Sequence, residues 1–218
     1  GYMGKSFEAA AEIGTLLAAE VIRVVKNAPE VGELVLACAR RNCSVMPNKY
    51  DLDLAEAAFQ VRVHQNTIAE YLGEDYFAGI TVQDPSPLKT LWADACRKVL
   101  EDNMGEAEMQ RLMGAVCNYR VHMGRLMNPS PQPVDMPVQV FRVNDYLFLA
   151  LPGEVLVEVS LDWQQRTGSD KAFIVGLANG AFGYLPHGSN FHEPGAEGKY
   201  ETIMNALEPR AIEIALDS

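Results

Sequence analysis

The residues best suited to chemistry lie in the last third of the chain, at two sharp turns. The first is the Pro152-Gly153-Glu154 corner, which interrupts the apolar stretch "LALPGEVLVEV" with a carboxylate. A lone acidic residue there is most often an exposed helix-start residue, favoured by the helix dipole. The second is the glycine-rich "NGAFGY", which runs from Asn179 to Tyr184. Carboxylate and phenol groups can contact a substrate or a metal ion. Whether these two groups can act together depends on the elements that position them.

The elements around these turns are typical of an α/β protein. "VQVFRV", a turn at 144–145 and "YLFLALPGE" predict a β-hairpin. Residues 155–163 fit both strand and helix periodicity, and we favour a helix because the corner is sharp and a polar face continues to Gly168. A strand, "KAFIVGLA", then precedes the glycine-rich turn. If the strands are neighbours, both turns emerge at one sheet edge, where α/β proteins place their sites.

The preceding part of the chain is predicted to be mainly helical. "KSFEAAAEIGTLLAAEVIRVVKNAPE" has the apolar spacing of a helix, and "ELVLACARRNCSVMP" reads as one or two strands. Further helices are expected over "LDLAEAAFQVRVHQNTIAEYLG", about 86–101 and about 106–127, and a short final helix is expected near Pro209. The methionine-rich side of the 106–127 segment is more typical of core packing than of a cofactor site.

The prolines of "NPSPQPVDMP" predict a linker or crossing loop over 129–137. This loop would separate a helix-rich α/β portion, 1–128, from an α/β portion, 138–218, that carries both turns. The predicted fold class is therefore α/β, a mixed sheet flanked by helices with a helical middle segment. Because "GYMGKSFEAAAEIG" enters a helix almost at once, we expect the chain to be the C-terminal part of a larger domain.

Composition narrows the classes of partner. The chain has 218 residues, 48% of them hydrophobic, which is the range of a globular protein. Its net charge of -11 argues against nucleic acid as a partner. The longest apolar runs are far shorter than the roughly 20 residues of a membrane span, so we expect no transmembrane segment. The cysteines are spaced too irregularly for a zinc ribbon and are read as core or reduced thiols.

Three segments carry a resemblance to a known family. "LALPGEVLVEV", "VGLANGAFGYLPH" and "GKYET" resemble the second half of the conserved domain of the neutral/alkaline ceramidases, zinc-dependent amidases that hydrolyse the N-acyl bond of ceramide. The resemblance is close over about 136–202. The opening helix, "SFEAAAEIGTLLAAEV", also resembles the helix that follows the family's nucleophile loop.

The resemblance implies a set of site residues. By position, Glu154 and Tyr184 correspond to the family's glutamate and tyrosine zinc ligands. Asn179, Gly180 and Gly183 would support the loop. The family's two zinc histidines and its serine lie upstream of the segment that this chain resembles.

Other residues near the turns have open roles. Tyr200 is placed near the site, but it follows Gly198-Lys199 where the family often has two glycines, so its role in lining the site is open. His187 and His192 could touch a metal ion or substrate, although histidines of a solvated loop are the more ordinary reading. His64 and His122 fall within predicted helices and are read as helix histidines.

The leading hypothesis is therefore a fragment of a ceramidase-like zinc amidohydrolase. Its substrate would be an N-acyl amide or sphingolipid-like small molecule, and a preceding portion of its own domain would complete the site. The alternatives are a metal hydrolase of a soluble amide, a noncatalytic relative, and a binding or oligomerisation module.

Three expectations can be checked against the structure or by experiment. The Glu154 side chain should lie at the end of a strand and point towards the Tyr184 hydroxyl. Gly180 and Gly183 should have positive φ or no room for a Cβ. Because the chain supplies two oxygen ligands and lacks the upstream residues, it should by itself bind zinc weakly or not at all and be catalytically silent.

Overall fold

The computed structural model describes residues 6–49, 51–84, 89–195 and 199–218, and its fold is mixed α/β, as predicted. The chain divides into two compact units, Gly1–Val35 and Leu36–Ser218, which are described separately.

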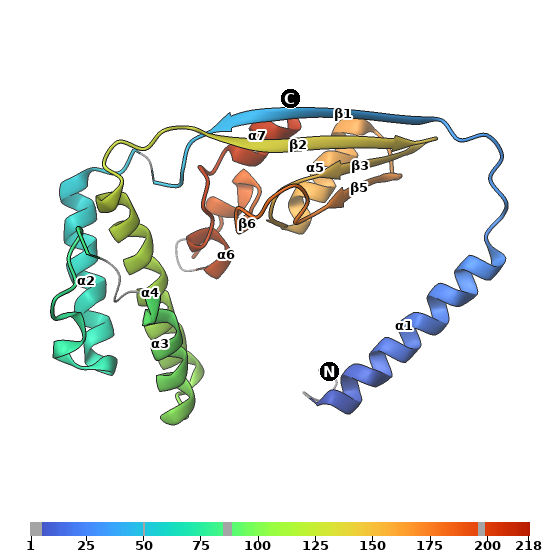
Figure 1. Ribbon diagram of the computed structural model, residues 1–218. Coiled ribbons are helices and arrows are strands. Elements are labelled where there is room, and N and C mark those ends of the chain that lie inside the picture. The colour runs from blue at the N-terminus through green and yellow to red at the C-terminus, as the bar shows by residue number, and fades with distance from the viewer. Residues whose placement is uncertain (1–5, 50, 85–88, 196–198) are drawn as a thin grey trace. The chain divides into compact units, whose positions relative to one another are not determined.

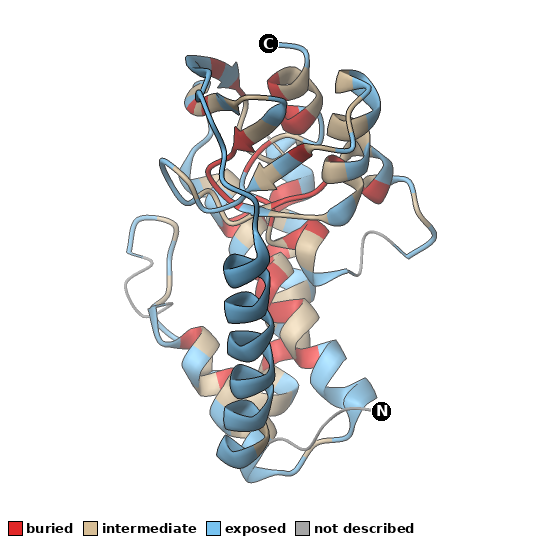
Figure 2. Ribbon diagram, turned by 90° about the vertical axis from the view of Figure 1, so that its right-hand side faces the viewer, coloured by how far each residue is buried: buried red, intermediate tan, exposed pale blue. Residues whose placement is uncertain are grey.

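The first unit is built around helix α1, Phe7–Asn27. The Ser6 side chain begins the helix by accepting a hydrogen bond from the Ala9 amide at 3.2 Å. The helix ends just before Pro29, which cannot continue it. None of its residues is buried, and most of the helix carries the exposed colour in Figure 2. The predicted helix is confirmed, and its apolar side chains lie exposed.

The second unit contains a four-stranded sheet with the order β1-β2-β3-β5 (Figure 1). Its strands are β1 (Leu36–Val45), β2 (Val134–Val143), β3 (Tyr146–Ala150) and β5 (Ala172–Val175). The first three strands pair antiparallel, and β5 pairs parallel with β3. The predicted hairpin and the mixed sheet are therefore confirmed.

The sheet corrects the predicted loop at 129–137. Strand β2 begins at Val134, so the last four residues of that segment are strand rather than loop. Pro137 is tolerated there because β3 pairs with β2 only from Gln139 onwards. Pro137 therefore has a partner strand on one side only, opposite Asn42 of β1. Since β1 pairs with β2, the predicted portions 1–128 and 138–218 share one sheet.

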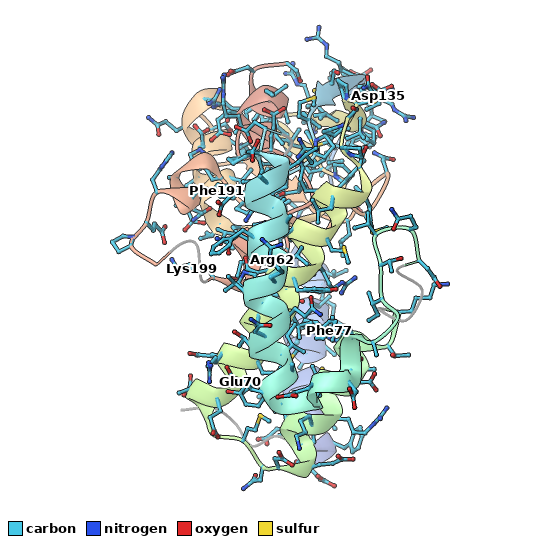
Figure 3. The ribbon with its side chains drawn as sticks, turned by 90° about the vertical axis from the view of Figure 1, so that its left-hand side faces the viewer. Arg62, Glu70, Phe77, Asp135, Phe191 and Lys199 are labelled. Atoms are coloured by element: carbon cyan, nitrogen blue, oxygen red, sulfur yellow. The ribbon has the colours of Figure 1, made fainter. Side chains whose placement is uncertain are left out.

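A helical layer with its own apolar core lies between β1 and β2 in the sequence. It comprises α2 (Leu54–Leu72), the short 3₁₀ helix η1 (Glu74–Phe77), α3 (Leu91–Glu101) and α4 (Glu106–Met127). The predicted start of α3 near Ser86 lies outside the described residues. Phe77 packs against Tyr119 of α4, and Glu70 pairs with Arg111 at 2.7 Å; Phe77 and Glu70 are labelled in Figure 3.

The remaining elements follow the hairpin. They are β4 (Glu154–Val155), α5 (Val157–Thr167), β6 (Tyr184–Leu185), the 3₁₀ helix η3 (Gly188–Phe191), α6 (Tyr200–Ile203) and α7 (Ala211–Leu216). The ambiguous 155–163 segment is thus mainly helix, as favoured. Residues of α5 and α7 pack with one face of the sheet in the second apolar core.

The opposite face of the sheet has an aromatic character. Phe141, Tyr146 and Phe173 are 39%, 44% and 42% exposed. The Phe173 ring stacks on those of Tyr146 and Phe148, with centroids 6.3 and 5.7 Å apart. Among the described residues, no helix is both long and apolar enough to cross a membrane.

Candidate functional site

The Pro-Gly-Glu corner and the glycine-rich turn lie directly against each other. Strands β4 and β6 pair in parallel, and Glu154 is the register partner of Tyr184. The Glu154 amide donates to the Gly183 carbonyl at 2.8 Å, and the Phe182 amide donates to the Pro152 carbonyl at 2.7 Å. Glu154 follows the end of β3 at Ala150, and the turn follows β5. The two turns therefore emerge at one sheet edge, as expected.

Glycines make this close approach possible. A Cβ on Gly153 would lie 2.5 Å from the Gly183 carbonyl oxygen and 2.7 Å from Leu185 Cγ. Gly183 has φ +77, and a Cβ there would lie 3.2 Å from the Met204 oxygen. A Cβ on Gly180, where φ is +158, would lie 3.1 Å from Pro152 Cβ. The prediction for Gly180 and Gly183 is confirmed, and Gly153 is a further requirement of the corner.

The Glu154 and Tyr184 side chains also interact. The pKa of Tyr184 is raised chiefly by burial of its hydroxyl, then by the negative charge of Glu154 and by a hydrogen bond with that carboxylate. At neutral pH the phenol therefore keeps its proton. The predicted approach of these side chains is confirmed, whereas their role as metal ligands stays a prediction.

Tyr200 joins this pair from helix α6. Its ring meets that of Tyr184 edge to face, with centroids 5.5 Å apart. The Tyr200 ring also lies near that of Trp92 of α3, with ring centroids 6.1 Å apart. The pKa of Tyr200 is raised, first by burial. Sequence reasoning placed Tyr200 near the site but missed Trp92, whose only signal was its position on a predicted helix.

Cys117 of α4 is the other reactive group next to Tyr200, whose pKa it influences. Burial raises the pKa of the Cys117 thiol to about 11. The thiol is therefore protonated at neutral pH, which argues against Cys117 as a nucleophile.

Asn179 supports the loop rather than facing the Glu154–Tyr184 pair. Its side-chain amide donates to Gln139 Oε1 of β2 at 3.1 Å. Its backbone has φ +63, a conformation that asparagine tolerates better than most residues. Asn179 therefore links the glycine-rich turn to the central sheet.

His187 has a structural position at the start of η3. Its Nδ1 accepts a hydrogen bond from the Ser189 amide at 3.2 Å, so the ring proton belongs to Nε2 when the histidine is neutral. Nε2 lies 3.4 Å from Asp162 Oδ2 and 3.5 Å from Glu213 Oε1. These contacts link η3 to α5 and α7. Among the described contacts, none joins His187 to Glu154 or Tyr184.

His192 follows η3 and is exposed. It lines a separate cavity together with Lys49 and Arg210. Neither histidine predicted as a site neighbour therefore has a described contact with the Glu154–Tyr184 pair.

The structure brings two oxygen donors together, and they fit part of a zinc site. Within residues 6–49, 51–84, 89–195 and 199–218, no group of three or more histidine, cysteine, aspartate or glutamate residues is arranged to hold a metal ion. Catalytic zinc sites typically use three protein ligands with imidazole or thiolate among them. Zinc at Glu154 and Tyr184 would therefore need nitrogen donors from elsewhere.

Comparisons with known proteins add no relative. No protein-family model, curated protein or solved structure matches this chain.

Proposed function

We propose that this chain is the C-terminal portion of a ceramidase-like zinc amidohydrolase and that Glu154 and Tyr184 are two of its zinc ligands. The observation that carries the proposal is the pairing of these residues in register on β4 and β6, where the Glu154 carboxylate raises the pKa of Tyr184 after burial. Two histidines of a preceding portion of the domain would supply the nitrogen ligands that the sequence resemblance implies.

The chemistry of the pair suits this role. A bound zinc ion would lower the pKa of a water molecule and polarise the carbonyl of an amide substrate. Glu154 would offer a carboxylate oxygen, and Tyr184 would have to release its phenol proton to coordinate the metal. Because burial and Glu154 raise the pKa of Tyr184, zinc binding should release a proton and strengthen with rising pH.

The surroundings of the pair indicate the part of the substrate that would bind there. Tyr200 and Trp92 present aromatic rings beside Tyr184. Such rings are suited to the apolar acyl group of an N-acyl amide. The substrate class is therefore an N-acyl amide, either sphingolipid-like or soluble.

The proposal can be tested by zinc titration monitored at the tyrosinate absorption band. Zinc should produce a weak tyrosinate signal that grows with pH in the 218-residue chain. Glu154→Gln and Tyr184→Phe should abolish it, whereas Tyr146→Phe, on the exposed aromatic face, should leave it unchanged. A signal that survives in the Tyr184→Phe variant would contradict the ligand assignment.

Activity provides a second test. We expect the chain alone to retain little zinc after dialysis and to hydrolyse no fluorescent N-acyl amide, because nitrogen ligands and the serine are expected in the preceding portion. Stoichiometric zinc, with turnover that vanishes in Glu154→Ala, would show instead that the chain is self-sufficient.

A binding or oligomerisation module is the second candidate function, and one observation favours it. Helix α1 has no buried residue, although Leu17 and Val21 are 64% and 53% exposed apolar side chains. Surfaces of this kind commonly mark protein contacts. Light scattering should then report an oligomer that Leu17→Glu disrupts and Thr15→Glu, on the polar side of α1, does not. A wild-type monomer would remove this candidate.

A further inference from the structure

A second concave site lies apart from the Glu154–Tyr184 pair. It is a surface cavity of about 640 Å³ whose lining includes Asn48, Lys49, Asn118, Thr202 and Arg210. These residues come from the segment between β1 and α2, from α4, from α6 and from the segment before α7. Phe191, labelled in Figure 3, also lines it. Several segments distant in sequence thus bring amide, hydroxyl and cationic groups to one cavity.

The two cationic side chains of this cavity have no ion-pair partner within the part of the chain that the structure describes. Neither Lys49 nor Arg210 forms an ion pair with any other residue that the structure describes. Burial lowers the pKa of Lys49, because taking an unpaired ammonium out of water is costly. The backbone of Lys49 also has φ +54, a strained conformation for a residue with a side chain. Lys49 therefore combines a partly buried charge with a strained backbone conformation.

The segment that carries Lys49 is held firmly in place. The Asn48 amide donates to the Ala206 carbonyl at 2.9 Å, and its side chain donates to the Asn205 carbonyl at 2.8 Å. On the other side, the Leu52 amide donates to the Lys49 carbonyl at 3.1 Å. The lysine is thus positioned by its backbone before any ligand arrives, which reduces the entropic cost of binding.

The histidines that Lys49 influences, His64 and His122, carry no negative charge that would neutralise it. The positive charge of Lys49 contributes to lowering the pKa values of His64 on α2 and His122 on α4, after burial. The two rings stack with centroids 5.7 Å apart, and His122 is only 5% exposed. The Nδ1 atom of His122 is buried without a hydrogen-bond partner among the described residues. Lys49 and the two histidines therefore influence one another electrostatically.

Two carboxylates also line the cavity, and neither pairs with Lys49. Glu208 Oε1 accepts a hydrogen bond from the Met46 amide at 2.7 Å, which holds it on the backbone. Asp51 is exposed to solvent. Asn48 and Asn118 add side-chain amides that can donate hydrogen bonds to oxygen.

We propose that this cavity binds a small oxyanion, a phosphate or carboxylate group, through Lys49 and Arg210. The anion supplies the negative partner that both cations lack. Because the Lys49 charge opposes protonation of His64 and His122, a bound anion relieves that opposition. By linkage, anion binding strengthens as these histidines become protonated.

The proposal is tested by calorimetric titration of the 218-residue chain with inorganic phosphate and, separately, acetate. Chloride at the same ionic strength is the reference, and the titrations are run at about pH 7, where the lowered pKa values leave His64 and His122 neutral. Saturable binding of phosphate, acetate or both beyond the chloride reference is expected. The two arms establish which oxyanion geometry the cavity prefers.

Variants locate the site. Lys49→Met and Arg210→Gln should each weaken binding by about tenfold or more, the usual effect of losing a charge-assisted hydrogen bond. Lys26→Met, on α1, is the matched control and should bind as the wild type does. Arg210 is exposed, so its variant decides the question if Lys49→Met does not fold. No binding beyond chloride, or equal binding by Arg210→Gln and Lys26→Met, would overturn the proposal.

Discussion

The corner region around Glu154 and the helical layer around His122 place polar groups in opposite ways. At the corner, backbone hydrogen bonds and glycines without room for a Cβ position an exposed carboxylate beside a phenol. In the helical layer, packing alone buries a histidine whose Nδ1 has no partner among the described residues. The first region is a backbone support that presents polar groups at the surface. The second region buries a histidine, His122, whose protonation in acid is opposed by burial.

The largest expected effect is that of Gly153→Ala at the corner. Its Cβ would lie 2.5 Å from the Gly183 carbonyl oxygen, a backbone atom that cannot rotate away. We expect a loss of about 4 kcal/mol in the free energy of unfolding, or failure to fold. Chemical denaturation measures this. The control is Gly114→Ala in α4, where a Cβ would meet nothing within 4 Å and should stabilise the helix by about 0.5 to 1 kcal/mol.

The helical layer should respond to acid. Burial, followed by the charges of Lys49 and His64, lowers the pKa of His122 from 6.5 to about 4 in the folded chain. The neutral form is favoured by folding, so this contribution to stability is complete above pH 6.5 and is lost as the pH falls towards 4. At 1.36 kcal/mol per pKa unit, the full loss is about 3 kcal/mol.

Denaturation midpoints measured between these pH values test this effect. His122→Leu should flatten the pH dependence, whereas His192→Gln, at an exposed position, should not. A wild-type slope retained in His122→Leu would assign the acid sensitivity to other groups.

The smallest effect concerns the titration of Tyr184. Because burial is the leading cause of its raised pKa and Glu154 the next, Glu154→Gln should lower that pKa without restoring the ordinary value. Absorbance titration of tyrosinate, with Tyr184→Phe to identify the signal, measures the shift. The free energy of unfolding should change by less than about 0.5 kcal/mol, because Glu154 is exposed. An unchanged Tyr184 titration would mean that the two side chains do not interact in solution.

Local sequence rules predicted most of the elements because the signals were local. Asp53 and Gly73 mark the ends of α2, and the Asn144-Asp145 turn marks the β2–β3 hairpin. The start of β2 was not predictable in this way. Pro137 is compatible with a strand only because its second side has no partner strand there, and that is a property of the assembled sheet.

The site was predictable in part for a similar reason. Turn chemistry and the resemblance pointed to Glu154, Tyr184, Gly180 and Gly183. Trp92 reaches Tyr200 through tertiary packing of α3, which no local pattern reveals. His187 lies near Tyr184 in sequence, yet its ring turns to carboxylates of α5 and α7. Proximity in sequence was a poor guide at that position.

Zinc uptake in the presence of imidazole tests the central claim most directly. Free imidazole can replace the nitrogen ligands expected from the preceding portion of the domain. Wild-type chain should then take up one zinc per chain, with affinity at least about tenfold above that of Glu154→Gln or Tyr184→Phe, since each variant loses one protein ligand. Equal uptake by wild type and both variants would contradict the assignment of Glu154 and Tyr184 as zinc ligands.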